Sequence, residues 1–206
     1  MPFFNLFDIY FKEQKINKEF FLLDNDITPS TYRTCRKIEH KIGPKIINTL
    51  SEKFSFKVVT DSLIDEIEEL LNNIYYDMYY KNYKHYDSYM NKISDLLKEN
   101  YLIFPIIDLM YLFLIASSNV SIRHLIIENE KLYQKVKKYE TFFKGNLIEI
   151  YELLYLMFEK DISHDYWIKN YTNASAYFIL ASKSYMNKKY IETLFFAEKS
   201  KKLLFE

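Results

Sequence analysis

Four polar residues near the N-terminus lie at helical spacing and could together contact a nucleic acid. They follow the Thr28-Pro29 pair at positions i, i+3, i+4 and i+7, and they are Ser30, Arg33, Thr34 and Lys37. On a helix such positions share one face. An arginine can make two hydrogen bonds to the edge of a guanine, serine and threonine can bond to bases, and lysine neutralises phosphate. The pattern therefore indicates a surface that could bind DNA, although a solvated basic helix of a lysine-rich chain would look the same.

The surroundings of this face are basic. Residues 28–53 hold six lysines and arginines against two acidic residues, and Arg36, Lys41 and Lys45 among them suit contacts with a phosphate backbone. Residues 1–57 carry a net charge of +3 and residues 58–206 one of −3, so that the whole chain is neutral. This partition predicts that the N-terminal part faces an anionic partner.

No residue pattern indicates catalysis. The sequence lacks a glycine-rich phosphate loop, a G-x-S-x-G elbow and an H-E-x-x-H zinc motif. The single Cys35 rules out an internal disulfide and a cluster of thiolate ligands, fits a reducing cytosol, and is expected to pack inward. The four histidines lie about forty residues apart, without the spacing of metal ligands. We therefore expect a cytoplasmic protein that is not an enzyme and has no metal or cofactor.

The composition favours an all-α fold. Two glycines and four prolines in 206 residues leave little of the turn chemistry on which hairpins, sandwiches and barrels depend. One apolar run, residues 101–116, contains Pro105 and Asp108 and falls short of the roughly twenty residues that span a bilayer. We expect this run to form a buried helix rather than a membrane segment.

Four short helices are predicted within residues 1–57. Asn17 can cap the second helix, whose inward-facing residues are expected to be Phe20, Phe21 and Leu23. Asn25 and Asp26 tolerate turn conformations without glycine, and they connect the second helix to the third.

The third of these helices has the clearest start. Thr28 is its expected N-cap and Pro29 its first residue, and it should end near Ile38 with Tyr32 and Cys35 on its buried side. The fourth helix restarts at Gly43-Pro44, and its buried side is predicted to comprise Ile46, Ile47, Leu50 and Phe54.

Residues 58–206 predict about eight longer helices in roughly four pairs. The first opens at Asp61 as N-cap, and its apolar positions at helical spacing are Leu63, Ile67, Leu70, Leu71, Ile74 and Met78. Residues 82–97 resemble residues 187–204, each with a Lys-Tyr turn and a closing Leu-Leu. Small residues allow close helix approach in the last pair, and they are Ala176, Ala181 and Ala197. The pattern predicts a solenoid of helical hairpins, with an irregular helical domain as the alternative.

Tyrosines are dense in residues 72–90, where they could form a ligand groove. A tyrosine offers a flat apolar ring and a hydroxyl group, a combination that suits peptide recognition. The candidate contacts with a peptide backbone are Asn72, Asn73, Tyr76 and Tyr80. Packing of tyrosines at half-buried positions is the alternative interpretation.

The segment "ITPSTYRTCRK" and the order of the short helices around it resemble the Cro/C1-type helix-turn-helix domain of bacterial and phage regulators, over residues 4–56. The resemblance implies that Ser30, Thr31, Arg33 and Thr34 read bases and that Arg36 and Lys37 lie on the phosphate side. Members of that family usually have glycine in the turn, where this chain has Asn25-Asp26.

The C-terminal helices look like degenerate tetratricopeptide-type (TPR-like) hairpins, and the whole chain resembles the RNPP class of quorum-sensing regulators. The resemblance implies an all-α fold with a helix-turn-helix domain at 1–57 and a TPR-like α-solenoid at 58–206. It also implies a homodimeric transcriptional regulator that binds double-stranded DNA and senses a short peptide or protein. The alternative hypothesis is a protein–protein adaptor that does not bind DNA and whose N-terminal helices only cap the solenoid.

Overall fold

The described part of the chain is built of helices. The computed structural model describes residues 3–37, 43–79, 82–118, 122–159, 169 and 171–205, which form eleven α-helices and no β-strand. The N-terminal part contains α1 (Phe3–Glu13), α2 (Lys18–Asp24), α3 (Pro29–Lys37) and α5 (Pro44–Lys53). The remainder contains α6 (Asp61–Tyr79), α7 (Tyr86–Lys98), α8 (Phe104–Ser118), α9 (Ile122–Lys137), α10 (Asn146–Phe158), α12 (Ala174–Met186) and α13 (Tyr190–Phe205). The prediction of an all-α fold is confirmed.

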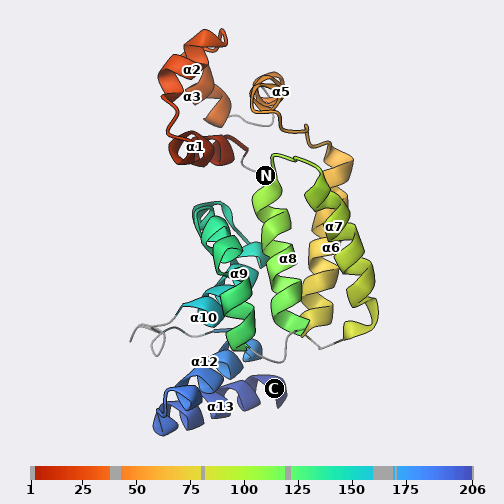
Figure 1. The fold of residues 1–206 in the computed structure, drawn as a ribbon, viewed down its shortest axis with the longest axis vertical. Helices are drawn as coiled ribbons and strands as arrows, with labels where there is room; N and C mark the ends of the chain where they lie inside the picture. Colours follow the sequence, from red (N-terminus) through yellow and green to blue (C-terminus); the bar gives the residue numbers. More distant parts are fainter. Residues whose placement is uncertain are drawn as a thin grey trace.

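The molecule is elongated, with the two parts of the chain stacked along its long axis. Helices α1, α2, α3 and α5 lie at one end and the α12–α13 pair at the other (Figure 1). In the middle, α8 packs against α6, α7, α9 and α10, and α10 in turn packs against α12. Helices α3 and α13 therefore lie near opposite ends of the molecule.

Helix α8 is the centre of the core. It corresponds to the apolar run at 101–116, and ten of its fifteen residues are buried. The prediction of a buried helix is confirmed, and no helix among the described residues is long and apolar enough to cross a membrane. The one acidic residue of α8, Asp108, is also buried, and its Oδ2 lies 2.7 Å from Lys135 Nζ of α9.

Two of the predicted faces differ from those in the structure. In α2, Leu22 is buried while Phe20 and Leu23 are 72 % and 58 % exposed, because the inward positions of this short helix are Lys18, Phe21, Leu22 and Asn25. In the last pair, Ala176 and Ala181 are buried as expected but Ala197 is exposed. Ser200 takes the close position instead, and its Oγ donates a hydrogen bond to the carbonyl of Ala174 at 2.9 Å.

The start of α6 also differs from the prediction by one residue. Thr60 Oγ1, and not the Asp61 carboxylate, accepts a hydrogen bond from the Leu63 amide at 3.3 Å. The predicted buried stripe is confirmed for Ile67, Leu70, Leu71, Ile74 and Met78, whereas Leu63 is half-buried.

Four of the described helices are followed by a residue other than glycine in the left-handed backbone conformation. The residues with positive φ are Lys15, Asp26, Ser55 and Lys188, at the ends of α1, α2, α5 and α12. Each is followed by a residue whose amide donates back into the last turn; the Ile27 amide, for example, bonds to the Leu22 carbonyl at 2.8 Å. This is the Schellman arrangement, in which glycine is the usual residue.

Aromatic rings join the N-terminal helices to the remainder. Phe56 stacks on Phe104 with 5.9 Å between ring centroids, and Tyr139 meets Phe104 edge-on at 5.2 Å. The Tyr139 hydroxyl donates to Glu13 Oε2 of α1 at 2.6 Å. The predicted domain boundary at residues 57 and 58 therefore lies at a packed junction and not in an open linker.

Candidate nucleic-acid interface

Helix α3 begins as its sequence predicts. The Thr28 Oγ1 accepts a hydrogen bond from the Thr31 amide at 3.1 Å, and Pro29 is the first helical residue. The Thr28 oxygen satisfies one backbone amide of the first turn, and the ring of Pro29 fixes its own φ at a helical value. The helix is described to Lys37, and its predicted end at Ile38 lies outside the described residues, as does Lys41.

The two faces of α3 divide as predicted. Tyr32 and Cys35 are buried at 2 % and 0 % exposure, and burial raises the pKa of the Cys35 thiol. The side chains of α3 that are predicted to contact DNA are all exposed, and they are Ser30, Thr31, Arg33, Thr34, Arg36 and Lys37. A helix anchored by one apolar face holds its polar face in a defined direction, as base recognition requires.

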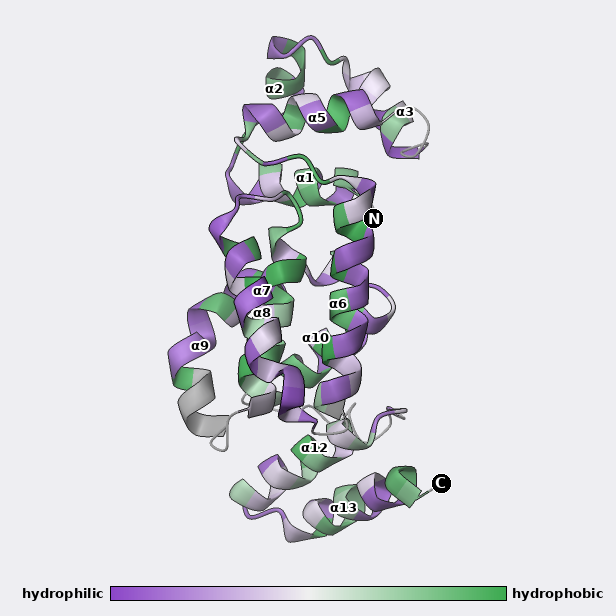
Figure 2. Cartoon of the chain, turned by 90° about the vertical axis from the view of Figure 1, so that its right-hand side faces the viewer, coloured by the Kyte–Doolittle hydropathy of each residue, from purple (hydrophilic) through white to green (hydrophobic). Residues whose placement is uncertain are grey.

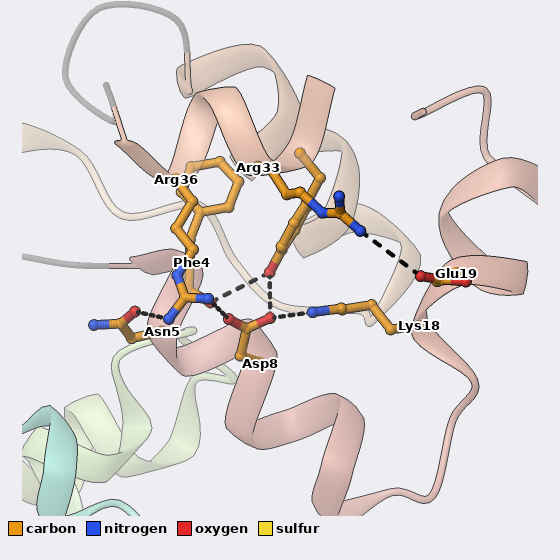
Figure 3. A network of polar contacts seen from close by, with 8 residues as sticks. Phe4, Asn5, Asp8, Lys18, Glu19, Arg33 and Arg36 are labelled. Atoms are coloured by element: carbon orange, nitrogen blue, oxygen red, sulfur yellow. Dashed lines mark hydrogen bonds and ion pairs between the residues drawn. The ribbon is translucent and has the colours of Figure 1, made fainter. Parts of the chain in front are cut away.

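Asp8 of α1 anchors α3 from below (Figure 3). Its carboxylate lies 3.0 Å from Arg36 Nη1, 3.0 Å from Lys18 Nζ and 3.1 Å from the Tyr32 hydroxyl. The same hydroxyl lies 3.3 Å from the Phe4 carbonyl, and Arg36 Nη2 donates to Asn5 Oδ1 at 3.3 Å. One carboxylate of α1 thus holds residues of both α2 and α3.

This cluster was missed by sequence reasoning. Asp8 lies between apolar residues in the middle of α1 and could have been noticed for that reason, but its partners could not have been named. Arg36 is consequently turned toward α1, with about half of its side chain exposed. The contact of Arg36 with a phosphate stays a prediction. In the structure Arg36 contacts Asp8 and Asn5 of α1.

The remaining cations of α3 point into solvent. Arg33 Nη2 lies 4.0 Å from Glu19 Oε1 of α2, and both side chains are more than two-thirds exposed, so the pair is a weak one. Lys37 and, on α5, Lys45 are exposed and form no ion pair with the described residues. Arg33 and Lys37 therefore remain available to an anionic partner.

The hydroxyl groups of α3 bond within the helix. Thr28 Oγ1 lies 2.9 Å from Ser30 Oγ and 2.8 Å from Thr31 Oγ1, and Thr34 Oγ1 donates to the Ser30 carbonyl at 3.0 Å. These bonds are exposed and local, so a base edge could replace them at little cost.

The turn before α3 places a residue in the left-handed conformation that favours glycine. Asp26 adopts φ 58°, and its amide bonds to the Leu23 carbonyl at 3.1 Å. Asparagine and aspartate tolerate this region better than other residues with a side chain. The expectation that Asn25-Asp26 forms a tight turn is confirmed.

The predicted peptide contacts lie on α6, in the other half of the molecule. Asn72 and Asn73 are exposed, Tyr76 is 63 % exposed, and Tyr80 lies outside the described residues. Of these, Asn72 borders a cavity of about 450 Å³, and its Oδ1 accepts a hydrogen bond from Asn146 Nδ2 at 2.7 Å. The apolar lining of this cavity comes from α6, α8, α10 and the 3₁₀ turn Glu140–Phe142, and includes Ile67, Leu71, Ile106, Phe142 and Leu147.

A neighbouring polar contact was not foreseen. The Tyr75 hydroxyl donates to Glu149 Oε2 at 2.6 Å and accepts from Asn173 Nδ2 at 3.3 Å. It ties α6, α10 and the start of α12 together. Tyr75 is thus a structural residue, although its neighbour in sequence, Tyr76, is exposed.

Comparisons with known proteins found no relative of this chain. No family model, no curated protein and no solved structure matches the chain. Within the part of the chain that the structure describes, no group of histidine, cysteine and acidic side chains is arranged to hold a metal ion.

Proposed function

We propose that this protein is a DNA-binding transcriptional regulator of the helix-turn-helix kind, with α3 as its recognition helix. The observation that carries the proposal is the exposed face of α3, which bears hydroxyl, guanidinium and ammonium groups. Helix α3 itself lies near one end of the molecule (Figure 1). Base reading is assigned to Ser30, Thr31, Arg33 and Thr34, and phosphate contact to Arg36, Lys37, Lys41 and Lys45.

The remaining helices act as a TPR-like repeat domain that senses a peptide or protein. The packing of α6, α8 and α10 in succession, with α7 and α9 beside them, supports a stack of helical hairpins. The cavity beside Asn72 combines five apolar lining residues with four polar ones, Glu68, Asn72, Lys144 and Asn146, and such a mixed lining could hold a peptide. Regulators of this type bind symmetric sites as dimers, so we also propose a homodimer.

The test is the binding of the purified protein to duplex DNA, followed by fluorescence anisotropy at several salt concentrations. Log affinity should fall linearly with log salt, because phosphate contacts release counterions. Lys37→Ala should lower the steepness of this dependence by about one unit, and Arg33→Ala should cost about 1–3 kcal/mol on the cognate sequence.

Lys92→Ala is the matched control, since it removes the same charge from an exposed position on α7. It should leave DNA binding unchanged. If the parent protein bound no DNA at low salt, or if the Lys37 and Lys92 variants behaved alike, α3 would not be a recognition helix.

A protein partner at the N-terminal helices is the second candidate. Phe20 and Leu23 are exposed apolar residues on α2, next to α3. Exposed apolar surface of this kind favours contact with another protein. An adaptor of this kind would bind no DNA at any salt concentration. Phe20→Ser would then weaken binding of the protein partner.

A further inference from the structure

The largest accumulation of exposed apolar side chains lies on the terminal helix pair. Nine of the sixteen large apolar side chains that are exposed among the described residues belong to residues 178–205. Figure 2 shows hydrophobic residues on both helices of this pair, at the end of the molecule away from α3. Apolar surface in such quantity marks an interaction site.

Helix α13 is the main carrier of this surface, and its orientation is defined by what it buries. Phe196 and Ser200 are the buried residues of α13, and they face α12. The opposite side of the helix therefore points away from the molecule. It carries residues at spacings of three and four, and they are Ile191, Leu194, Glu198, Lys201 and Phe205. Ile191, Leu194 and Phe205 are 84 %, 66 % and 82 % exposed.

The outward residues of two α13 helices complement each other when the helices run antiparallel. If a second copy of α13 runs antiparallel, with the two-fold axis between residues 199 and 200, Leu194 of one copy lies opposite Phe205 of the other. Glu198 then lies opposite Lys201, and both contacts occur twice by symmetry. Neither Glu198 nor Lys201 forms an ion pair with the described residues of its own chain.

We infer that α13 is the homodimer interface of this protein, formed with α13 of a second copy in antiparallel orientation. The charges favour a second copy over an unrelated partner, because one helix supplies both members of each apolar and each ionic pair. The exposed ends of α12 and α13, with Tyr185, Met186 and Tyr190, extend the apolar area beside the stripe. This interface would join the two copies of the homodimer in the proposed function. The interface itself is argued from the structure, and only the biological role of the dimer rests on the proposed function.

Charge reversal tests the inference directly. Glu198→Lys would place lysines opposite each other, and Lys201→Glu would do the same with carboxylates, so each variant should raise the dimer dissociation constant about tenfold or more. The double variant, Glu198→Lys with Lys201→Glu, restores both pairs and should dimerise like the parent. Mixing the two single variants should give a heterodimer, because each then supplies the charge that the other lacks. Light scattering and native mass spectrometry measure all four cases.

Leu194→Asp and Ile127→Asp separate this interface from apolar surface in general. Both residues are about two-thirds exposed, on α13 and α9 respectively, so neither change should unfold the chain. The Leu194 variant should be monomeric and the Ile127 variant should dimerise normally. A parent protein that stayed monomeric, a dimer unaffected by the reversals, or single reversals not rescued by combination would overturn the inference. DNA binding, measured separately by anisotropy, would not be decided by any of these results.

Discussion

At the residue scale, Tyr32 is the side chain that ties α3 to α1. Its ring is buried against Phe4 with centroids 5.2 Å apart, and its hydroxyl lies 3.1 Å from Asp8 and 3.3 Å from the Phe4 carbonyl. Tyr32→Phe keeps the ring but leaves the buried carbonyl and carboxylate without this hydroxyl. We expect the free energy of unfolding to fall by about 1–2 kcal/mol, measured by urea denaturation.

The control for this change is Tyr185→Phe, since Tyr185 is 64 % exposed. Its effect should stay within about 0.5 kcal/mol. Equal stability of the Tyr32 variant and the parent would mean that ring packing alone holds α3 in place.

The faces of single residues were predictable only where a helix had a strong apolar pattern. Tyr32 and Cys35 were placed correctly, because the rest of α3 is polar. Phe20 and Leu23 were placed wrongly, because α2 contains four apolar residues within seven and no period can be read from them. The Asp8 cluster joins residues far apart in sequence, and its contacts arise only from tertiary packing.

At the element scale, glycine should stabilise the protein at the positions that follow a helix and have a positive φ. They are Lys15, Asp26, Ser55 and Lys188. A side chain in this conformation costs more than the backbone entropy that glycine loses on folding. Lys188→Gly should therefore raise the free energy of unfolding by about 0.5–1 kcal/mol. Lys131→Gly, at an exposed position inside α9, should lower it by about 1 kcal/mol. Urea denaturation of both variants checks the opposite signs, and destabilisation by both would contradict the expectation.

Most elements were predictable because periodicity and cap residues are local signals. The start of α3 at Thr28-Pro29 and the buried stripe of α6 followed from such signals. The contact of Ser200 with the Ala174 carbonyl did not, since serine is small enough for close packing but is usually assigned to a surface. The cavity beside Asn72 was also beyond local reasoning, because its walls come from segments up to about eighty residues apart.

At the scale of the whole molecule, buried lysine and tyrosine side chains set the dependence of stability on pH. Burial lowers the pKa of Lys183 to about 8, an effect that Glu159 partly offsets. An unfolded lysine titrates near 10.5, so the unfolded chain binds more protons between these values and the free energy of unfolding rises with pH from about 8 to about 10.5. Burial raises the pKa of Tyr89 to about 12, helped by Asp77, and also raises the pKa values of Tyr133, Tyr139, Tyr151 and Tyr171. Unfolded tyrosines lose their protons near pH 10, so stability falls above that value.

The buried Cys35 thiol, whose pKa burial raises, opposes this rise from about pH 9, where the unfolded thiol loses its proton. Urea denaturation across the alkaline range should therefore show stability rising above about pH 8, levelling between about pH 9 and 10, and falling above about pH 10. Lys183→Met should remove the rise and leave the fall above about pH 10. A parent protein whose stability fell steadily from pH 8 would show that Lys183 is fully charged at little cost in the folded state.

The placement of α3 and α13 at opposite ends determines what a dimer through α13 can reach. Its two copies of α3, the proposed recognition helices, would lie at the extremes of an assembly two molecules long. Helix-turn-helix dimers joined beside their recognition helices contact half-sites about 34–36 Å apart, one turn of the duplex. A dimer joined through α13 would instead contact half-sites separated by several turns of the duplex, or two separate duplexes. The symmetric site of the proposed function would then be a widely spaced pair of half-sites rather than one short palindrome.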